Sequence, residues 1–426
     1  MNISASPGLF GAGRERRAEL AALGLVLLLG LMTRGLAILV LKEPLTPFSD
    51  STNYLEMART LAAHLLMRDE FGSVAFFSPG YPVACALAFS VAGAQLGTVL
   101  ALNVALGVAA TLLTYLLARR ATRDRAVALI AAAAFALLIP AVAGSAFVQK
   151  ENLSVPLLIG FTLAVVVLLD TKRPRLVAAL SGLLYGAGLL AGASVILTGG
   201  VVVIALLWRK QAWQETAAAI GAFAVGTAIV VGPWLWHVDR TLGRPVLTTN
   251  GPFNLYVGNN PAATGRFVSM RDTPLGAQWR VMRARDGELR ATDRLGELAI
   301  AHIRTHPAET GALAMRKLAL FWLPDVPDNA DQAHGTVITA LRWAEALQHV
   351  LIVLLGGLAV IQWRGRTRAE RLILITIACF WLVHAAAYVM PRYRLPVLPL
   401  LLVSATSMVM PLVRRPVRGA AIRASA

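Results

Sequence analysis

Charged side chains are scarce in this chain. They make up 15% of its 426 residues, whereas a soluble domain carries about 25%. Hydrophobic residues make up 57%, and they recur in apolar runs of about 20 residues, the length that a helix needs to cross a bilayer core. The shortage of charge therefore excludes a soluble globular fold. It predicts an all-α polytopic membrane protein, because helices satisfy their own backbone hydrogen bonds in lipid.

Cysteine is almost absent. The chain has two cysteines, Cys85 and Cys379, and both lie in apolar segments far apart in the sequence. We interpret them as packing residues rather than as a disulfide, so they do not report the redox compartment. The small-residue cleavage site of a secretory signal peptide is also missing after the first apolar run. We therefore expect that run to be a membrane span.

Common catalytic motifs are missing as well. The sequence has no Walker loop, no dinucleotide fingerprint, no DxD triplet, no HExxH and no zinc-type spacing of Cys and His. It also has no cytoplasmic segment large enough to hold a nucleotide. An enzyme built on this chain and working outward would therefore need an activated donor that is already in the membrane.

The positive charge is what the chain has in excess, with a formal net charge of +17. We reject nucleic acid as a partner, because the basic residues cluster at the ends of apolar runs, where they act as orientation signals. If the short piece 79–93 does not cross, the basic clusters 118–125, 171–175, 208–210 and 364–371 all face the cytoplasm, together with 414–418. This assignment predicts ten spans with both termini inside. They are 19–41, 97–118, 126–147, 152–170, 176–190, 193–208, 214–236, 336–361, 371–389 and 394–413.

The predicted organisation has five parts. They are a cytoplasmic and disordered tail (1–18), a catalytic half (19–236) that contains an active-site outer loop (42–82), an extracytoplasmic segment (237–335), C-terminal spans (336–413) and a second tail (414–426). Within the extracytoplasmic segment we expect a polar helix over 275–306. We also expect an interfacial helix over 309–324, although that stretch and 79–93 could instead be a pair of additional spans.

Polar groups converge on the outer face under this topology. Ionisable residues at membrane depth are costly and mark functional sites. The candidates are Asp50, the Lys150–Glu151 pair, the loop from Asn250 to Asn260, and Arg392 with Arg394.

Each candidate also has a structural interpretation. Asp50 is either a general base or an N-cap, a role that Ser49 or Ser51 could also fill. Glu151 either faces the same cavity as Asp50 or stabilises the first turn of its helix through the macrodipole. Tyr54 is expected at the water boundary of an interfacial helix.

The arginines near the C-terminus favour an anion. Arg392 and Arg394 stand at the outer side, against the orientation rule, so a bound phosphate or pyrophosphate explains them better than topology does. Arg34, inside the first span, either partners them or snorkels outward.

Taken together and in order, these pieces resemble the GT-C superfamily of membrane glycosyltransferases, in its protein mannosyltransferase, aminoarabinose transferase and Rgt-like branch. The likeness covers about residues 20–410. It is carried by Asp50 with Tyr54 and Ala58, the turn Ser78-Pro79-Gly80-Tyr81-Pro82, Glu151, Pro233-Trp234, the NGxxNxYxGNNPxAxG loop (Asn250, Asn254, Asn259 and Asn260) and RYRLPxxP (392–399).

The resemblance implies a GT-C-like helix bundle at the cytoplasmic (inner) membrane, with extracytoplasmic loops and interfacial helices. Its donor would be a polyprenyl-phosphate sugar, and its acceptor a glycan, lipid or protein. By resemblance Asp50 is the base, Glu151 lines the same cavity, and Arg392 and Arg394 hold the donor phosphate. Aminoarabinose-type members carry a Lys beside the proline turn where this chain has Ser78, so Lys150 and Lys317 are further candidates for that phosphate.

The remaining predictions concern metal and function. No cofactor is required, although a divalent cation between Asp50 and Glu151 is possible, and no metal site is assigned. Two other functions stay open. One is a transporter or flippase with a charged outer vestibule, although no inverted repeat is visible. The other is an O-antigen ligase or polymerase, which would use pyrophosphate-linked donors.

Overall fold

The computed structural model describes residues 9–41, 45–327 and 335–413, and within them nearly all regular structure is helical. The one bridge between extended residues pairs Arg266 with Val389. The helices, in chain order, are α1 (Leu9–Val40), α2 (Asp50–His64), α3 (Gly80–Ala92), α4 (Leu96–Thr122), α5 (Arg125–Ala136), α6 (Ile139–Gly144), α7 (Glu151–Leu168), α8 (Pro174–Ala191), α9 (Gly200–Trp208), α10 (Trp213–Leu242), α11 (Asn250–Gly258), α12 (Gln278–Thr305), α13 (Pro307–Trp322), α15 (Thr336–Ile361), α16 (Arg368–Val383) and α17 (Leu398–Val413). Short 3-10 turns are η1 (Ala193–Gly199), η2 (Met270–Asp272), η3 (Trp363–Gly365) and η4 (Pro391–Arg394).

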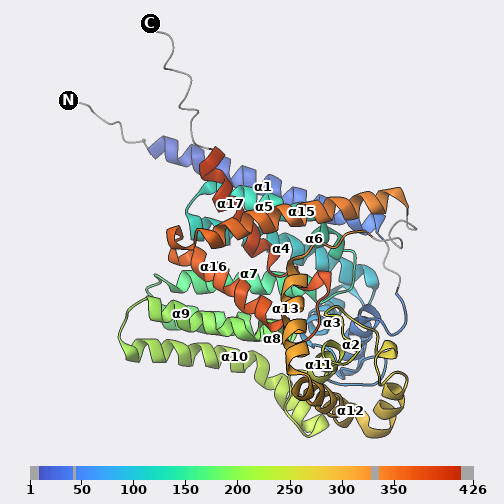
Figure 1. Cartoon of the computed structure of the whole chain (residues 1–426). Coiled ribbons are helices and arrows are strands. Elements are labelled where there is room, and N and C mark those ends of the chain that lie inside the picture. The colour runs from blue at the N-terminus through green and yellow to red at the C-terminus, as the bar shows by residue number, and fades with distance from the viewer. Residues whose placement is uncertain (1–8, 42–44, 328–334, 414–426) are drawn as a thin grey trace, which may run out of the picture.

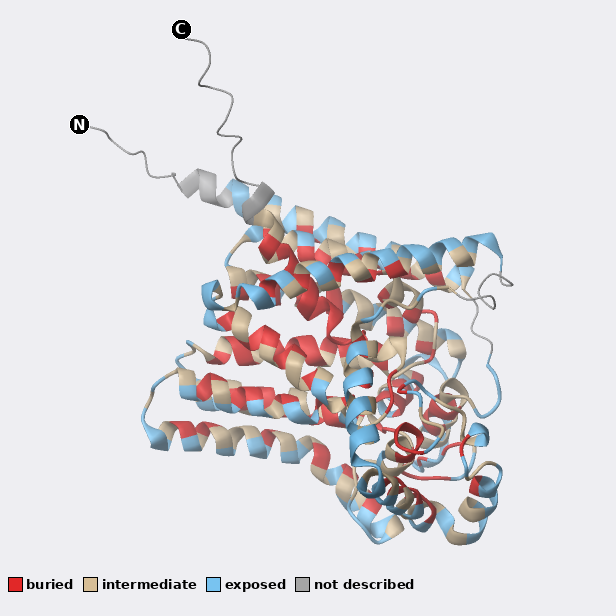
Figure 2. Cartoon of the chain, viewed as in Figure 1, coloured by how far each residue is buried: buried red, intermediate tan, exposed pale blue. Residues whose placement is uncertain are grey.

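The helices form a stack with an appendage at one end. The long helices lie roughly side by side in layers, from α1 and α15 at one edge to α10 at the other, while α2, α3, α11, α12 and α13 gather at one end (Figure 1). Burial is greatest in the middle layers, and the outer helices carry many exposed residues (Figure 2). Many of these exposed residues on α1, α10 and α15 are large and apolar. Such an apolar exterior is what a protein needs when lipid is its solvent.

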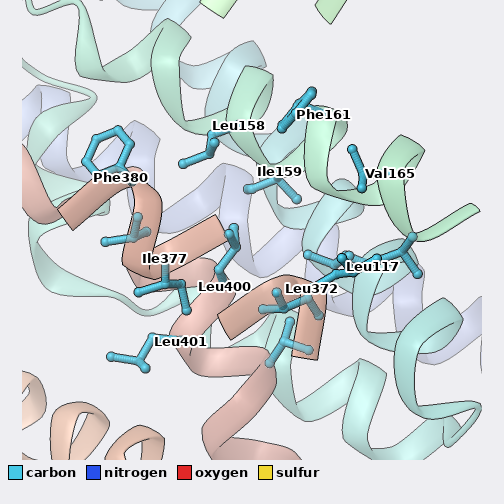
Figure 3. Packing of buried hydrophobic residues seen from close by; sticks show 14 of the residues in the cluster. Leu117, Leu158, Ile159, Phe161, Val165, Leu372, Ile377, Phe380, Leu400 and Leu401 are labelled. Carbon is cyan, nitrogen blue, oxygen red and sulfur yellow. The ribbon is translucent and has the colours of Figure 1, made fainter. Parts of the chain in front are cut away.

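Helix α7 is the centre of the core. Two thirds (67%) of its membrane window is buried, compared with 39% or less in the other candidate spans. Its residues Leu158 and Ile159 point toward side chains from α4, α16 and α17, such as Leu117 and Leu400 (Figure 3). On another side of the helix, Phe161 packs against the ring of Tyr185 on α8. A helix that is apolar on all sides belongs in such an interior position.

Six helices of the described residues are long and apolar enough to cross a membrane: 14–40, α4, α7, α8, α10 and α15. Shorter apolar helices accompany them at 80–92, 125–136, 193–208 and 398–410. Helical structure therefore occupies all ten predicted spans, and the fold class predicted from the sequence is confirmed. The number of crossings stays a prediction.

The predicted span 126–147 is not one helix. It divides into α5 and α6 at Leu137–Leu138. Pro140, near the start of α6, has no N–H and restricts the residue before it, which favours a break there. The side chain of Gln348 on α15 satisfies the exposed backbone: it accepts from Ile139 N at 3.0 Å and donates to Leu137 O at 3.2 Å.

The N-terminal tail also differs from expectation. Helix α1 begins at Leu9, so residues 9–18 continue the first helix rather than forming a disordered segment. Residues 1–8 and the predicted tail 414–426 lie outside the described residues. Arg34 does not snorkel: it is fully buried, donates to Gly30 O at 3.1 Å and lies over the Phe135 ring.

Contacts between the basic clusters bring them to one end of the helix stack. Arg120 pairs with Asp170, and Arg209 donates to Leu168 O and Thr171 O. Arg368 donates to Trp208 O. The clusters at 118–125, 171–175, 208–210 and 364–371 therefore share one face, as the orientation argument required.

Candidate functional site

Asp50 is the first residue of α2, and its neighbour Ser49 is the N-cap. Ser49 Oγ accepts from Thr52 N at 3.3 Å, which is the capping bond. The cap interpretation of Asp50 is therefore wrong, because the chain uses Ser49 for that role. The Asp50 side chain is 43% exposed and accepts a hydrogen bond from the guanidinium of Arg392. The carboxylate is thus both accessible and held in place.

Glu151 lies on the other side of the same guanidinium. It is the first residue of α7, and its side chain is only 4% exposed. Arg392 Nε lies 3.9 Å from Glu151 Oε1, which is an ion-pair distance rather than a hydrogen bond. The structure therefore brings Asp50, Glu151 and Arg392 together from α2, α7 and η4, as the sequence predicted. We call these three residues the charged triad.

The two carboxylates of the triad stabilise the charged form of Arg392. Burial lowers the pKa of Arg392, but the nearby carboxylates of Glu151 and Asp50 outweigh it, so the pKa is raised overall. Arg392 therefore remains a cation at every physiological pH. Burial raises the pKa of Tyr54 far above its usual value, and the charges of Asp50 and Glu151 raise it further. Tyr54 is a neutral phenol beside the triad.

Aromatic rings form the walls around the triad. Tyr54 is buried, not at a water boundary as predicted, and packs edge-on against Phe77 and Tyr81. On the other side, the Tyr388 and Tyr393 rings lie 5.9 Å apart. The guanidinium carbon of Arg392 lies 6.0 Å from the centroid of Tyr393, within the range of a cation–π contact.

Part of the sequence, and the fold as a whole, are similar to known proteins. Residues 78–237 match the profile of the dolichyl-phosphate-mannose-protein mannosyltransferase family. No curated protein sequence matches. Among solved structures, the archaeal oligosaccharyltransferase AglB from Archaeoglobus fulgidus, in complex with an inhibitory peptide and a dolichol-phosphate, aligns over 96% of this chain with a TM-score of 0.51 and 14% identity. The chain has a GT-C fold.

Two further structures are similar. The apo form of the Archaeoglobus fulgidus oligosaccharyltransferase aligns over 93% of the chain, with a TM-score of 0.51 and 15% identity. ArnT from Cupriavidus metallidurans, bound to undecaprenyl phosphate, aligns over 92% of this chain and 77% of its own length, with a TM-score of 0.45 and 15% identity. The GT-C chain spans about half the length of the archaeal proteins, 53% and 51% in the two structures.

Arg394 is not brought to the triad. Its Nη1 donates to Leu323 O at 2.6 Å, and it lies beside His349 and Glu345 around a hollow of about 10 Å³. Burial lowers its pKa, while the carboxylates of Glu345 and Asp325 oppose this effect. These contacts give no support to the prediction that Arg394 shares an anion with Arg392.

The two lysines proposed for the donor phosphate occupy different places. Lys150 precedes Glu151, and a Cβ added at Gly192 would lie 3.6 Å from its Nζ, so it extends over the turn between α8 and η1. Lys317 is fully buried and donates to Asn259 Oδ1 at 3.0 Å. Lys317 therefore supports the fold of the outer loops, whereas the role of Lys150 stays a prediction.

The predicted loop residues mostly hold the loops of the GT-C chain in shape. Asn259 Nδ2 donates to Leu255 O and Ala386 O, and Asn260 Nδ2 donates to Tyr256 O. Asn250 accepts from its neighbour Thr248. Tyr81 is buried and donates to Asn103 Oδ1 at 2.8 Å. These contacts indicate structural roles.

Asn254 is different, because its Oδ1 accepts from Tyr388 Oη at 3.2 Å and so links the loop to the triad's wall. Tyr388, four residues before Arg392, was not among the site residues predicted from the sequence. A tyrosine in an apolar stretch next to the RYR motif was the available signal.

Metal ligands do not cluster in the part of the GT-C chain that the structure describes: it contains no group of three or more His, Cys, Asp or Glu residues placed to hold an ion. A hollow of about 420 Å³ is lined by residues of the segment 68–74, the end of α10 and α12, and by none of the triad residues. The charged side chains of the triad define the candidate site. Bound substrate and lipid would form the rest of its walls.

Proposed function

We propose that the chain is a glycosyltransferase that moves a sugar from a polyprenyl-phosphate donor to an acceptor at the outer face of the cytoplasmic membrane. The observation that carries the proposal is the charged triad, in which one accessible carboxylate and one buried carboxylate share a guanidinium. The family match and the GT-C fold support it. So does the dolichol-phosphate bound in the archaeal structure with the same fold. The donor would have to be a membrane lipid, because the chain lacks a nucleotide-binding motif.

Each member of the triad has a role in this reaction. Asp50 takes the proton from the acceptor's nucleophilic group, which bonds to the anomeric carbon. The bond between that carbon and the phosphate oxygen breaks, and its electron pair stays on the polyprenyl phosphate. Arg392 stabilises the charge on the departing phosphate, since a guanidinium has five N–H donors and can serve Asp50 and the phosphate together. Glu151 holds Arg392 in position. The tyrosine walls limit the entry of water.

Reconstituted transfer tests the proposal. Purified protein in liposomes would receive undecaprenyl-phosphate sugars and a mixture of envelope glycans, lipids and peptides. We expect transfer by the wild type and a loss of roughly 10²–10⁴-fold in Asp50→Asn, the range for a missing general base. Glu56→Gln, a carboxylate substitution on the same helix, is the matched control and should retain activity. Transfer at the wild-type rate by Asp50→Asn would refute the role of Asp50.

Further arms separate the competing functions. Movement of lipid-linked sugar across the bilayer without transfer would favour a flippase, and activity only with pyrophosphate-linked donors would favour a ligase. Because Arg392 already places a positive charge between the carboxylates, we expect transfer to persist in the presence of EDTA. Loss of transfer with EDTA and its recovery with Mg²⁺ or Mn²⁺ would instead support a divalent cation at Asp50 and Glu151.

A further inference from the structure

The backbone just before Asp50 is in an unfavourable conformation. Phe48, two residues earlier, has φ +63°, in the left-handed region that residues other than glycine rarely adopt. Such a conformation persists only where surrounding contacts hold it, and it is often found at functional sites. The contacts that hold Phe48 therefore also determine where Asp50 lies.

Glu70 supplies the main polar contact. One oxygen of its carboxylate, Oε2, accepts from Phe48 N at 2.7 Å and from Thr52 Oγ1 at 2.6 Å. These two donors lie two residues before and two residues after Asp50. The ring of Phe71, next to Glu70, packs on the ring of Phe48 with centroids 4.9 Å apart. Glu70 thus holds the chain on both sides of Asp50.

The backbone at Glu70 is tied to the same turn. Glu70 N donates to Asn53 Oδ1 at 3.1 Å, and Asn53 Nδ2 donates to Ser49 O at 2.7 Å. Asn53 is fully buried. The first turn of α2 and the segment around Glu70 therefore form one hydrogen-bonded unit.

That segment is itself anchored to α12. Asp69 Oδ1 accepts from Phe71 N and Ser73 N, at 2.9 and 2.7 Å, which shapes the turn. Arg283 donates to Asp69 and Ser73 and stacks over Phe71. Glu288 accepts from the next two backbone amides, Val74 N and Ala75 N, at 2.8 and 3.0 Å. Glu70 is consequently presented from a rigid support rather than from a free loop.

We propose that Glu70 is a positioning residue that fixes Asp50 for proton removal, which rests on the function proposed above. Its contacts are with Phe48, Thr52 and Asn53, whereas Arg392 contacts Asp50 from another element. Glu70 therefore acts through the backbone around Asp50 and not on the substrate. Displacing a reacting group by about 1 Å can cost roughly 10²-fold in rate. A carboxylate that fixes the turn around Asp50 can therefore affect the rate strongly without touching the substrate.

Substitutions at Glu70 separate geometry from charge. Both donors bond to a single oxygen, so the amide oxygen of Glu70→Gln can accept both bonds without a negative charge. Glu70→Asp keeps the charge but is one methylene shorter, and Glu70→Ala has no acceptor. We expect kcat to fall roughly 10²-fold in Glu70→Ala and Glu70→Asp and to stay near the wild-type value in Glu70→Gln. The KM for the lipid donor should remain unchanged, because Arg392 is intact.

A second measurement reports position without using activity. Hydrogen exchange of the peptide 45–57 should accelerate in Glu70→Ala, stay slow in Glu70→Gln, and be unaltered elsewhere in the chain. Adding Phe48→Gly to Glu70→Ala should restore part of kcat, because glycine adopts positive φ without strain. Unchanged exchange in Glu70→Ala, or equal losses in Glu70→Gln and Glu70→Ala, would overturn the positioning role.

The proposed function is tested separately within the same series. Full transfer by Asp50→Asn would remove Asp50 as the base. Faster exchange at 45–57 in Glu70→Ala but not in Glu70→Gln would still support the role of Glu70 in fixing the Asp50 turn.

Discussion

Arg392 donates a hydrogen bond to Asp50, a residue 342 positions earlier in the chain. The same guanidinium lies 3.9 Å from the buried carboxylate of Glu151. Arg392 therefore offers its single positive charge to two carboxylates, one that solvent can reach and one that is almost fully buried. A charge buried without a partner is costly. The fold can therefore bury the Glu151 carboxylate at low cost only while Arg392 is present.

Arg392→Met should destabilise the fold. The substitution leaves Glu151 buried without its cation, and breaking a buried pair costs about 3–5 kcal/mol. We expect a smaller loss, about 2 kcal/mol, because Arg392 is itself partly exposed. Arg392→Met combined with Glu151→Gln should recover most of the loss, since the buried unpaired charge is gone and the Asp50 carboxylate that remains is 43% exposed. Thermal unfolding of the purified proteins in detergent measures both.

An exposed pair provides the control for this cycle. Arg175→Met breaks the ion pair with Glu215, in which both side chains are largely exposed, and should change stability by less than about 1 kcal/mol. If the double variant were no more stable than Arg392→Met, the buried carboxylate would not be the cause of the loss.

Arg392 and Arg394 lie in different surroundings for a geometric reason. The sequence predicted that they share one anion, and this stays a prediction; in the structure only Arg392 bonds to Asp50, whereas Arg394 donates to Leu323 O. Both lie in η4, a 3-10 turn with three residues per turn. Residues two apart in such a turn point in directions that differ by about a third of a turn. Sequence spacing could place the pair near the outer face but could not reveal this turn.

Asp50 and Glu151 were predictable as candidates because carboxylates at the predicted outer ends of the apolar runs are few. Tyr54 was misplaced because hydropathy places α2 near the membrane surface but does not show that Phe77 and Tyr81 cover it. Glu70 was missed for a similar reason: its partners are backbone and hydroxyl donors, which leave no pattern in the sequence. The positions of the apolar helices were therefore within reach of the sequence, whereas the contacts that shape the site were not.

Gln348→Leu should destabilise the bundle at the break between α5 and α6. The side chain pairs the N–H of Ile139 and the C=O of Leu137, and both groups lack water if the break lies in the membrane. Leaving them unpaired should cost about 1–3 kcal/mol per group at most. Gln348→Glu keeps an acceptor for Ile139 N but loses the donor to Leu137 O and adds a charge that is costly in the membrane, so it should also be less stable than the wild type.

The adjacent Leu347 is the matched control for Gln348. Its side chain is exposed on the outside of α15, so Leu347→Ala should have little effect on the melting temperature. Equal stability of Gln348→Leu and the wild type would show that the break is satisfied by other groups.

Because of Lys317, the stability of the protein should change with pH in the alkaline range. It lies on α13, is fully buried and donates to Asn259. Burial lowers its pKa from 10.5 to about 8. A lowered pKa means that the unfolded chain binds the proton more strongly than the folded one. The free energy of unfolding therefore rises as the pH increases from about 8 to 10.5. It falls again when the pH is lowered through the same range to 8.

Comparison of variants isolates this contribution from other groups that titrate at high pH. Between pH 8 and 10 the wild type should gain stability relative to Lys317→Met, by at most about 1.4 kcal/mol per pH unit, the limit for one proton. Lys172→Met, which removes an exposed lysine, should keep the wild-type slope. Melting temperatures measured in detergent across this range would decide the matter. Parallel curves for Lys317→Met and the wild type would mean that Lys317 keeps an ordinary pKa, and that its partner Asn259 and local water compensate fully for its burial.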